Sequence, residues 1–553
     1  MDVRESGAGL QPGPSSGPER TLVAALLFLA AVAIFEPAGS GLAEPDETRY
    51  AEIPREMLAT GDFVVPRLNG LPYFEKPPLL YWADAAAFRL LGTTPWAARL
   101  PTRLAGLGTV ALVVLAAGAG ARRRDGLAAG ILLLASPIGF LLVRTNLTDG
   151  LLTFFLTATL LAARAAIERR EENRPWRMLA AAAGAAAAGA FLTKGLIALV
   201  LPGLVLLVWA AATGRLRGLF ALLASPAPLV FLVLATPWFV LVERRHPGFL
   251  HFFFVHEHFQ RFATGAAKRA GPPYYFVPVF VLGFLPGLAF FLAPLRGASR
   301  RRDPRFFFLV WFAVVFAFFS VSRSKLPPYL FPAIPAAAVL AGGVAAEPRR
   351  RGPWAVHAAL ASAFALALVL DPVTRGFLME NRLQALVAPA LGILVLVAWA
   401  ALVFARDAPR LALLSLAAGW GAFLAAVVLA WPQVPQARFP AELAAAARAQ
   451  GAPGRAPLIG YKDYVNGVSV ALATPIPVAA YVGELEPVFE TDDAVRDRLL
   501  WSSEKFWREW KSDRPMLALV RLQDVVEMMT AVPPARVVRW AGRHAIVANY
   551  PER

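Results

Sequence analysis

The feature that most constrains this chain is the repetition of apolar runs long enough to cross a bilayer. We count about thirteen such runs of about 17 to 25 residues each. Of the 553 residues, 57% are hydrophobic and only 17% are charged, which is too apolar for a soluble protein of this length. We therefore predict a polytopic α-helical membrane protein. The runs begin near Thr21, Arg99, Gly126, Gly150, Met178, Leu196, Gly218, Tyr274, Phe306, Pro328, Trp354, Leu383 and Leu411.

The positive charges indicate the orientation of these spans. The net charge is +17, but most Lys and Arg lie in short loops between apolar runs, which argues against a nucleic-acid partner. With a cytoplasmic N-terminus, every inward loop is short and basic: "RRRDG", "ERREENRPWR", "TGRLRG", "RGASRRRDPR", "EPRRRG" and "ARDAPR". The outer side then carries residues 39–98, "RTNLTDG", "TKG", residues 243–273, "SRSKLPPY" and the tail after Trp431.

Composition also divides the chain into three parts. Residues 1–20 are rich in Gly, Pro and Ser, and we predict a disordered cytoplasmic segment there. Residues 21–431 form the predicted membrane domain, and the first span is retained because no cleavage motif follows it. Residues 432–553 have mixed composition and are predicted to form a small α/β domain on the outer side. The chain has no cysteine, so disulfides and thiolate metal sites are excluded.

The first outer loop, residues 39–98, is unusually polar for its position. Two amphipathic patterns, around "TRYAEIPREMLATG" and "PPLLYWADAAAFRLLG", predict helices that lie in the membrane interface. One interpretation is that this loop merely covers the helical bundle. Its residue types favour a functional role instead.

Ionisable residues gather on the outer side of the predicted bundle. Such groups are costly near a membrane unless they are paired or face water, so their collection indicates a functional site. Cations and Tyr hydroxyls suit a phosphate, and carboxylates suit a base or a metal. The set comprises Asp46, Glu47, Arg49, Tyr50, Glu75, Lys76, Asp149, Lys194, His251, His256, Glu257, His258, Arg261, Lys325 and Tyr329.

Several of these residues also have structural interpretations. Asp46 and Asp149 each precede a helical pattern and would serve as N-caps. Lys194 at the end of a span would snorkel to the interface. The short "HEH" run is more often a wet surface than a metal site, and as a metal site it needs another ligand from elsewhere.

The tail reads as short strands, "APLIGYKDY", "PIPVAAYVG", "PMLALVRL" and "RHAIVANY", with an amphipathic helix in "ETDDAVRDRLLWSSEKFWREWKS". The helix carries aromatic residues at helical spacing, namely Trp501, Phe506, Trp507 and Trp510. Such a stripe contacts an acceptor in one interpretation and forms core in the other. We favour the core.

The stretch "PDETRYAEIPREMLATGDFVVPRLNGLPYFEKPPLLYW" resembles the first periplasmic loop of bacterial aminoarabinose (4-amino-4-deoxy-L-arabinose) lipid A transferases and of the related polyprenyl-phosphate-mannose-type protein mannosyltransferases. "LTDG", "LTKG", "FFFVHEHFQRF" and "SKLPPYLFPAIPA" follow in the family's order. The resemblance covers about residues 20 to 345. It implies the C-type membrane glycosyltransferase fold, a helical bundle consistent with the about thirteen transmembrane helices counted above, with a site facing the periplasm of the bacterial inner membrane.

The resemblance also implies roles for individual residues. Asp46 is the implied catalytic carboxylate, and Asp149 matches a second acidic position of the family. The residues implied to bind the donor phosphate are Tyr50, Lys76, Arg261 and Arg49. Those implied to line the cavity are Tyr73, Lys194, Lys325 and Tyr329. Glu75 and His256, with His258 as the alternative, resemble a pair that binds zinc or another divalent metal.

The chemistry of the residues agrees with these roles. A polyprenyl phosphate leaves as an anion, so preorganised cations stabilise the transition state. Asp46 acts as a general base toward a hydroxyl acceptor, whereas an ionised phosphate acceptor needs only orientation or stabilisation of charge on the sugar. No Gly-rich phosphate loop occurs, so no nucleotide cofactor is predicted.

We therefore predict a glycosyltransferase that takes a sugar of the aminoarabinose type, or a related one, from a polyprenyl-phosphate carrier. It transfers the sugar to lipid A or another envelope acceptor, and the protein itself is surrounded by membrane lipid. One alternative is a polyprenyl-phosphate-mannose-type protein O-glycosyltransferase. An alternative of another class is a sugar-lipid transporter. Charges that gather at one face instead of the midplane favour the enzyme over the transporter.

Overall fold

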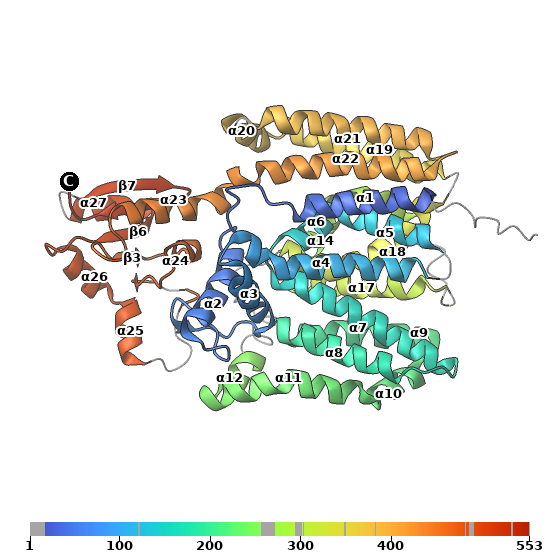
Figure 1. Ribbon diagram of the computed structural model, residues 1–553, viewed down its shortest axis with the longest axis horizontal. Coiled ribbons are helices and arrows are strands. Elements are labelled where there is room, and N and C mark those ends of the chain that lie inside the picture. Colours follow the sequence, from blue (N-terminus) through green and yellow to red (C-terminus); the bar gives the residue numbers. More distant parts are fainter. Residues whose placement is uncertain are drawn as a thin grey trace, which may run out of the picture.

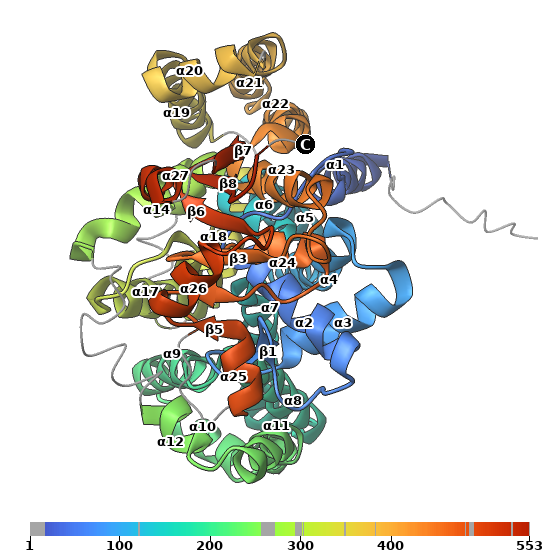
Figure 2. The same cartoon turned by 90° about the vertical axis from the view of Figure 1, so that its left-hand side faces the viewer.

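The computed structural model describes residues 17–119, 122–255, 271–293, 301, 303–347, 350–381, 383–481, 483–485, 492–531 and 535–551. Long helices run side by side through most of the molecule, and a C-terminal domain built on a β-sheet lies beyond one end of them (Figure 1). The end-on view shows that α19, α20 and α21 stand at the edge of the bundle (Figure 2). Polytopic helical architecture with a C-terminal α/β domain is thus as predicted.

Apolar composition forms the bundle, because a helix satisfies its own backbone hydrogen bonds in lipid. Its elements are α1 (Gly17–Ile34), α4 (Pro95–Ala117), α5 (Arg123–Ala135), α6 (Pro137–Arg144), α7 (Thr148–Glu171), α8 (Arg177–Lys194), α9 (Ile197–Thr213), α10 (Leu216–Leu223), α11 (Pro226–Arg245), α12 (Phe249–His251), η3 (Pro273–Tyr275), α14 (Phe276–Gly283), α15 (Leu285–Leu292), α17 (Phe306–Val321), η4 (Pro327–Ala333), α18 (Ile334–Ala346), α19 (Arg351–Leu370), α20 (Pro372–Glu380), α21 (Gln384–Phe404) and α22 (Pro409–Ala430).

In the described residues, seven helices are long and apolar enough to cross a membrane, or up to nine if two bent pairs each count as one span. The bent pairs are α5 with α6, at 78°, and α14 with α15, at 105°. The run expected from Gly218 divides into the short α10 and the longer α11. The first helix begins at Gly17, inside the segment predicted to be disordered, and residues 1–16 lie outside the described residues.

The first outer loop folds as predicted into two helices, α2 (Asp46–Thr60) and α3 (Leu79–Leu91), which lie between the bundle and the C-terminal domain (Figure 1). A hairpin, β1 (Arg67–Leu68) and β2 (Leu71–Pro72), joins them. Its turn is Asn69-Gly70, with φ of 55° and 78°. Asn-Gly suits such a two-residue turn because both residues tolerate positive φ.

The C-terminal domain contains a six-stranded mixed sheet in the order β5-β4-β3-β6-β8-β7. The first four strands are parallel, and β8 runs antiparallel to both of its neighbours, β6 and β7, while Leu458 of β3 lies beside Leu517 of β6. Its elements are η5 (Trp431–Gln433), α23 (Pro435–Ala449), β3 (Leu458–Tyr461), α24 (Asn466–Leu472), β4 (Val478–Ala479), α25 (Asp493–Leu499), β5 (Leu500–Trp501), α26 (Ser503–Trp510), β6 (Leu517–Arg521), η6 (Leu522–Asp524), α27 (Val525–Ala531), β7 (Arg536–Ala541) and β8 (His544–Ala548).

The aromatic stripe of α26 is largely core, as favoured above. Phe506 and Trp510 are completely buried beneath the sheet, and their rings stack at 5.7 Å. Trp507 packs against the same cluster and is partly buried. Trp501, at the end of β5, is also partly buried, and one side of it lines a surface pocket described below.

The C-terminal domain is fastened directly to the first loop. The Asn69 side chain donates to the Ile476 carbonyl at 2.8 Å and accepts from the Ile476 N–H at 2.7 Å. The Arg55 guanidinium donates to the Ala473 carbonyl at 3.2 Å. A Cβ at Gly70 would lie 2.7 Å from a methyl of Leu499, so the turn glycine also permits this close approach. The domain and the loop are therefore one packed unit.

Two buried carboxylates of α2 lie at this junction. Arg55 forms a bidentate ion pair with Glu52 at 2.7 and 2.6 Å. Glu56 is also buried, and its carboxylate accepts the Gly70 N–H at 2.9 Å. Burial, followed by the adjacent Glu52 carboxylate, raises the pKa of Glu56 to about 8. Folding therefore favours the protonated form of Glu56.

We expect the free energy of unfolding to fall as the pH rises from about 4.5 to about 8. The folded state binds the Glu56 proton more tightly than the unfolded state does. The contribution of this proton to the free energy of unfolding is therefore complete below the pKa of Glu56 in the unfolded state, and it is lost as the pH rises to the pKa in the folded state. Glu56→Gln keeps the acceptor for Gly70 and should flatten the dependence, measured as thermal midpoints in detergent at several pH values. Glu172→Gln, on an exposed residue, is the control. An unchanged slope in Glu56→Gln would contradict the assignment.

Candidate functional site

Helix α2 presents Asp46, Arg49 and Tyr50 on one face, since residues three and four apart are neighbours on a helix. The Arg49 Nη1 atom donates to Asp46 Oδ1 at 2.9 Å. Pro45 occupies the N-cap position and Asp46 is the first helical residue, without a capping hydrogen bond. The interpretation of Asp46 as an N-cap is therefore wrong, and its carboxylate is aimed at Arg49 instead.

Asp149 and Lys194 form a second acid–base pair. The Lys194 Nζ atom lies 2.6 Å from Asp149 Oδ1, and their side chains are only 15% and 11% exposed. The same ammonium lies 4.8 Å from the ring centre of Tyr329, a cation–π contact. Leu147, not Asp149, is at the N-cap position of α7. The capping interpretation of Asp149 is therefore wrong. Lys194 does not reach out to the interface but is held in a largely buried ion pair.

Three buried tyrosines, Tyr50, Tyr73 and Tyr81, lie close to one another and to Arg49, and we call them the tyrosine wall. The rings of Tyr50 and Tyr81 are 6.2 Å apart. Burial, followed by the Asp46 carboxylate, raises the pKa of Tyr50, and Asp149 acts in the same direction. Tyr50 therefore lies within electrostatic reach of both acids, and its hydroxyl stays protonated as a hydrogen-bond donor.

Glu75 and Lys76 lie next to the tyrosine wall. The Lys76 Nζ atom donates to the Glu75 carbonyl at 2.9 Å and lies 3.9 Å from its carboxylate. Burial, followed by the Glu75 carboxylate, raises the pKa of Tyr73, and Arg49 opposes that rise. The loop residues Tyr73 and Glu75 thus lie close to Arg49 and Tyr50, as the sequence predicts.

The predicted metal pair is only partly visible. His256 and His258 lie outside the described residues, as do Glu257 and Arg261. In the part of the chain that the structure describes, no three His, Cys, Asp or Glu side chains gather as a metal site. The metal and the contribution of Arg261 stay predictions.

Lys325 contributes differently from its neighbours. Its Nζ atom donates to the carbonyls of Phe319 and Ser320 at 2.8 and 2.7 Å, at the C-terminal end of α17. The last carbonyls of a helix have no hydrogen-bond partner within it, and these two bonds satisfy two of them. The positive charge of Lys325 is also favourable at the negative end of the helix dipole. Two of the three ammonium donors are therefore used to terminate α17.

Glu47 has a central structural role that its sequence context does not indicate. Its carboxylate accepts two bonds from Arg99, at 2.8 and 2.6 Å, and one each from the N–H groups of Ala43 and Asn146, at 2.9 and 2.8 Å. Arg99 also contacts Glu36 at 2.5 Å. These bonds join the start of α2 to α4 and to the connection before α7. Adjacency to Asp46 was the only sequence signal for this function.

A second residue that sequence reasoning missed comes from the C-terminal domain. The Arg49 Nη2 atom lies 2.5 Å from Glu484 Oε2, and Asn466 donates to Glu484 Oε1 at 3.1 Å. Arg49 therefore bridges Asp46 on its own helix and Glu484 from a distant part of the chain. No local pattern around Glu484 indicates this contact, because it depends on how the domain packs on the loop.

The arrangement suits a phosphorylated sugar. Arg49 and Lys76 are cations that can face a phosphate, and Tyr50 supplies a hydroxyl donor. Asp46 and Asp149 supply carboxylates within electrostatic reach of that hydroxyl. Such a site can stabilise negative charge on a departing phosphate and positive charge on a sugar ring.

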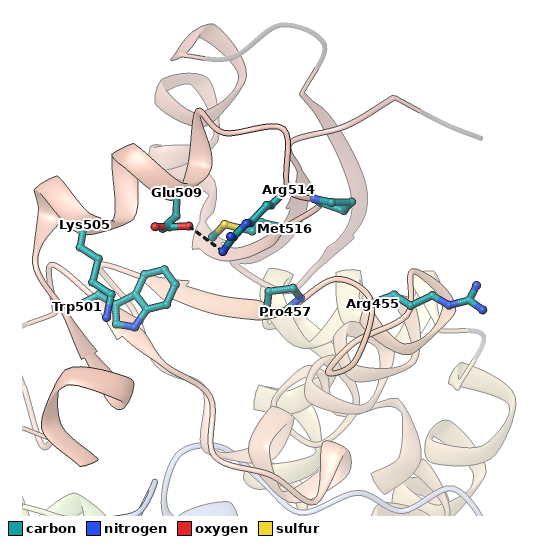
Figure 3. A pocket seen from close by; sticks show the side chains of 8 residues that line it. Arg455, Pro457, Trp501, Lys505, Glu509, Arg514 and Met516 are labelled. Carbon is teal, nitrogen blue, oxygen red and sulfur yellow. Dashed lines mark ion pairs between the residues drawn. The ribbon is translucent and has the colours of Figure 1, made fainter. Parts of the chain in front are cut away.

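A separate hollow of about 450 Å³ lies on the C-terminal domain (Figure 3). It contains the Trp501 ring and two cations but neither the acid pairs nor the tyrosine wall, so it is not the reaction site. Its lining residues are Arg455, Pro457, Trp501, Lys505, Glu509, Arg514, Pro515 and Met516.

Residues 20–253 match the family model described as dolichyl-phosphate-mannose-protein mannosyltransferase. The chain is similar to "undecaprenyl phosphate-alpha-4-amino-4-deoxy-L-arabinose arabinosyl transferase 1" of Proteus mirabilis, with 37% identity over 292 residues, 52% of this chain and 53% of that protein. The protein of the same name from Sodalis glossinidius is 34% identical over 382 residues, 67% of this chain and 66% of that protein. The matches thus span between about half and two thirds of these relatives.

Similarity in structure covers nearly the whole chain. The crystal structure of ArnT from Cupriavidus metallidurans bound to undecaprenyl phosphate matches with a TM-score of 0.84 and 30% identity, over 97% of this chain and 98% of that one. The apo structure of the same protein matches with a TM-score of 0.81, over 96% and 97%. The shared architecture therefore includes the C-terminal domain.

We expect Asp149→Ala to lower the free energy of unfolding by about 3 kcal/mol, because it leaves the buried Lys194 ammonium without its anion. The double variant Asp149→Leu/Lys194→Met removes both charges at similar volume and should recover most of the loss. Denaturation in detergent measures all three proteins. If the double variant lost as much stability as Asp149→Ala, the cost would come from packing and not from the unpaired charge.

Proposed function

Because this chain belongs to the family of undecaprenyl-phosphate aminoarabinose transferases, within the mannosyltransferase-related C-type membrane glycosyltransferases, we propose that it transfers aminoarabinose from undecaprenyl phosphate to lipid A. The observation that carries the proposal is the convergence of Asp46–Arg49 and Asp149–Lys194 around the Tyr50 hydroxyl. That arrangement supplies both the cations and the carboxylates that sugar transfer from a phosphate requires.

In the proposed reaction the bond from the sugar's anomeric carbon to the donor phosphate breaks, and a bond forms to an acceptor oxygen. Negative charge grows on the departing phosphate, and Lys76, Arg49 and the Tyr50 hydroxyl stabilise it. Asp46, held by Arg49, stabilises the positive charge that develops on the sugar ring. An ionised phosphate acceptor needs no base, whereas a hydroxyl acceptor would give its proton to Asp46.

Arg261 would add a further cation to the donor phosphate. Glu75 and His256, with His258 as the alternative, would hold a divalent metal, which would add positive charge near that phosphate. The Glu75 side chain is 26% exposed, so its carboxylate is accessible to an ion. This carboxylate and imidazole chemistry suits zinc among other metals.

We also propose the finer topology. Counting α1, α8, α9 and α17 as spans, and each bent pair as one, brings the total to about thirteen. The multi-pass chain would lie in the bacterial inner membrane with residues 1–20 in the cytoplasm. Residues 432–553 would form the periplasmic domain beside the site. The ion pair between Arg123 and Glu19 supports a common side for the α4–α5 loop and the start of α1.

The first experiment reconstitutes the full chain in nanodiscs with undecaprenyl-phosphate aminoarabinose and lipid A. Mass spectrometry should show a pentosamine added to a lipid A phosphate. Transfer to a polypeptide hydroxyl instead would support the protein O-glycosyltransferase that the family model favours. Movement of the donor lipid across liposomes without any glycosidic product would support the transporter.

Lys76→Ala should lower the rate of transfer by about 100-fold or more, because one preorganised cation is lost from the departing phosphate. The quantity to measure is kcat/KM for the donor at saturating acceptor. Lys511→Ala, which removes an exposed lysine of the C-terminal domain, should leave it unchanged. Full activity of Lys76→Ala would overturn the assignment of Lys76 to the donor phosphate.

We expect Glu484→Gln to lower kcat about tenfold, since Arg49 loses the charged partner that fixes its guanidinium beside Asp46. Asn69→Ala is the matched control, because it removes two bonds of the same domain contact without touching Arg49. The Arg49→Lys/Glu484→Gln double variant should be no slower than Arg49→Lys. Additive losses would mean that Glu484 acts independently of Arg49.

A further inference from the structure

The pocket on the C-terminal domain is lined partly by α26, which lies toward the end of the molecule away from the helical bundle (Figure 1). Pro457 and Met516 immediately precede the parallel strands β3 and β6, so they lie side by side at the N-terminal edge of the sheet. The other end of β3 leads to Tyr464, which packs with Tyr50 of α2. The strand between them is four residues long, about 13 Å. The pocket thus extends from the N-terminal edge of β3 and β6 to α26 and to Trp501, which ends β5 level with Tyr461.

Its lining is cationic and aromatic. Lys505 and Arg514 contribute two positive charges against the single carboxylate of Glu509, which lies 3.9 Å from Arg514, whereas the guanidinium of Arg455 points away from the other lining side chains (Figure 3). The side chains come from the turn before β3, from α26 and from the turn before β6. The chain therefore brings positive charge to one hollow from α26 and from the turn before β6.

The tryptophan in this pocket is fixed in place. The Trp501 Nε1 atom donates to the Arg498 carbonyl at 3.0 Å, which fixes the ring. The Lys505 Nζ atom lies 4.6 Å from its ring centre and donates to the Asp497 carbonyl at 2.6 Å. A fixed aromatic ring beside positioned cations is a rigid recognition surface, because little side-chain freedom is lost on binding.

We propose that this pocket binds a phosphorylated saccharide belonging to the acceptor, outside the part of it that receives the sugar. The proposal rests on the proposed function. Guanidinium groups pair with phosphate oxygens in a planar fork, and an indole ring packs against the apolar face of a sugar. A volume of about 450 Å³ lies within the usual range of small-ligand pockets and suits a saccharide of a few rings.

Position distinguishes the saccharide from the lipid part of an acceptor. The acyl chains of a glycolipid stay in the bilayer, and its reacting phosphate must reach the tyrosine wall next to the bundle. A ligand group that reaches the pocket beside α26 must therefore project from the membrane, as an oligosaccharide attached to the lipid does. The pocket would select acceptors that carry such an anionic saccharide over bare lipid A.

Binding tests the pocket without using transfer. The full chain in nanodiscs is titrated with the phosphorylated core oligosaccharide released from lipopolysaccharide, and with the same oligosaccharide after dephosphorylation. We expect the phosphorylated form to bind, and Arg514→Glu to weaken it at least tenfold, because a charge-assisted bond becomes a repulsion. Arg543→Glu is the matched control, since Arg543 lies beyond the other end of β6. Equal binding of both oligosaccharides, or equal losses in both variants, would overturn the proposal.

Transfer assays distinguish a saccharide carried by the acceptor from a soluble one. They also separate the proposed transferase function from the proposed saccharide pocket. With lipopolysaccharide as acceptor, Arg514→Glu and Lys505→Glu should each raise the acceptor KM at least fivefold and leave the donor KM and kcat unchanged. With lipid A as acceptor, neither variant should differ from the natural chain. A loss with both acceptors would refute a saccharide subsite, as would no loss with lipopolysaccharide. Absence of transfer by the natural chain, with oligosaccharide binding intact, would refute the proposed function but keep the pocket as a site for soluble phosphorylated saccharides.

Discussion

The buried ion pair between Glu47 and Arg99 is the interaction on which the site depends. Burial alone would raise the pKa of Glu47, but Arg99 and two backbone N–H donors outweigh it and lower that pKa. A buried ion pair adds little net stability, yet removing one partner is costly, so its value lies in fixing geometry. The ion pair joins the start of α2, with Asp46, to α4, and the Asn146 N–H that also donates to Glu47 joins it to the connection that leads to Asp149. The two acids lie on different elements, and these bonds connect those elements.

The C-terminal domain completes the same geometry from the other side. Asn69 joins it to the first hairpin, and Glu484 reaches Arg49 beside Asp46. Arg49 is therefore held between a carboxylate of its own helix and one from the domain. A cation with two anionic partners has little freedom to turn, and preorganised charge is what accelerates a reaction in which a phosphate departs.

Local patterns predicted what depends on local physics. Apolar runs specified the helical bundle, amphipathic periodicity specified α2 and α3, and the spacing of Asp46 and Tyr50 placed both on one helical face. The capping interpretations of Asp46 and Asp149 were wrong because a residue that precedes a helical pattern can also begin the helix, as Asp46 does. Glu484 was missed because its partner lies more than 400 positions away in sequence, and only packing of the domain brings them together.

The position of the site between bundle and sheet follows from the chemistry that we propose. A polyprenyl chain is stable only in the bilayer, whereas the phosphate at its end requires cations and donors that are costly inside hydrocarbon. Helix α2 resolves this conflict, since it lies at the end of the bundle with Asp46, Arg49 and Tyr50 on one face and the C-terminal domain packed behind it. The domain covers part of that face, because Arg49 and Tyr50 are buried there while the Asp46 side chain stays 40% exposed. Charged groups interact more strongly there than in water, which favours transition-state stabilisation over mere binding.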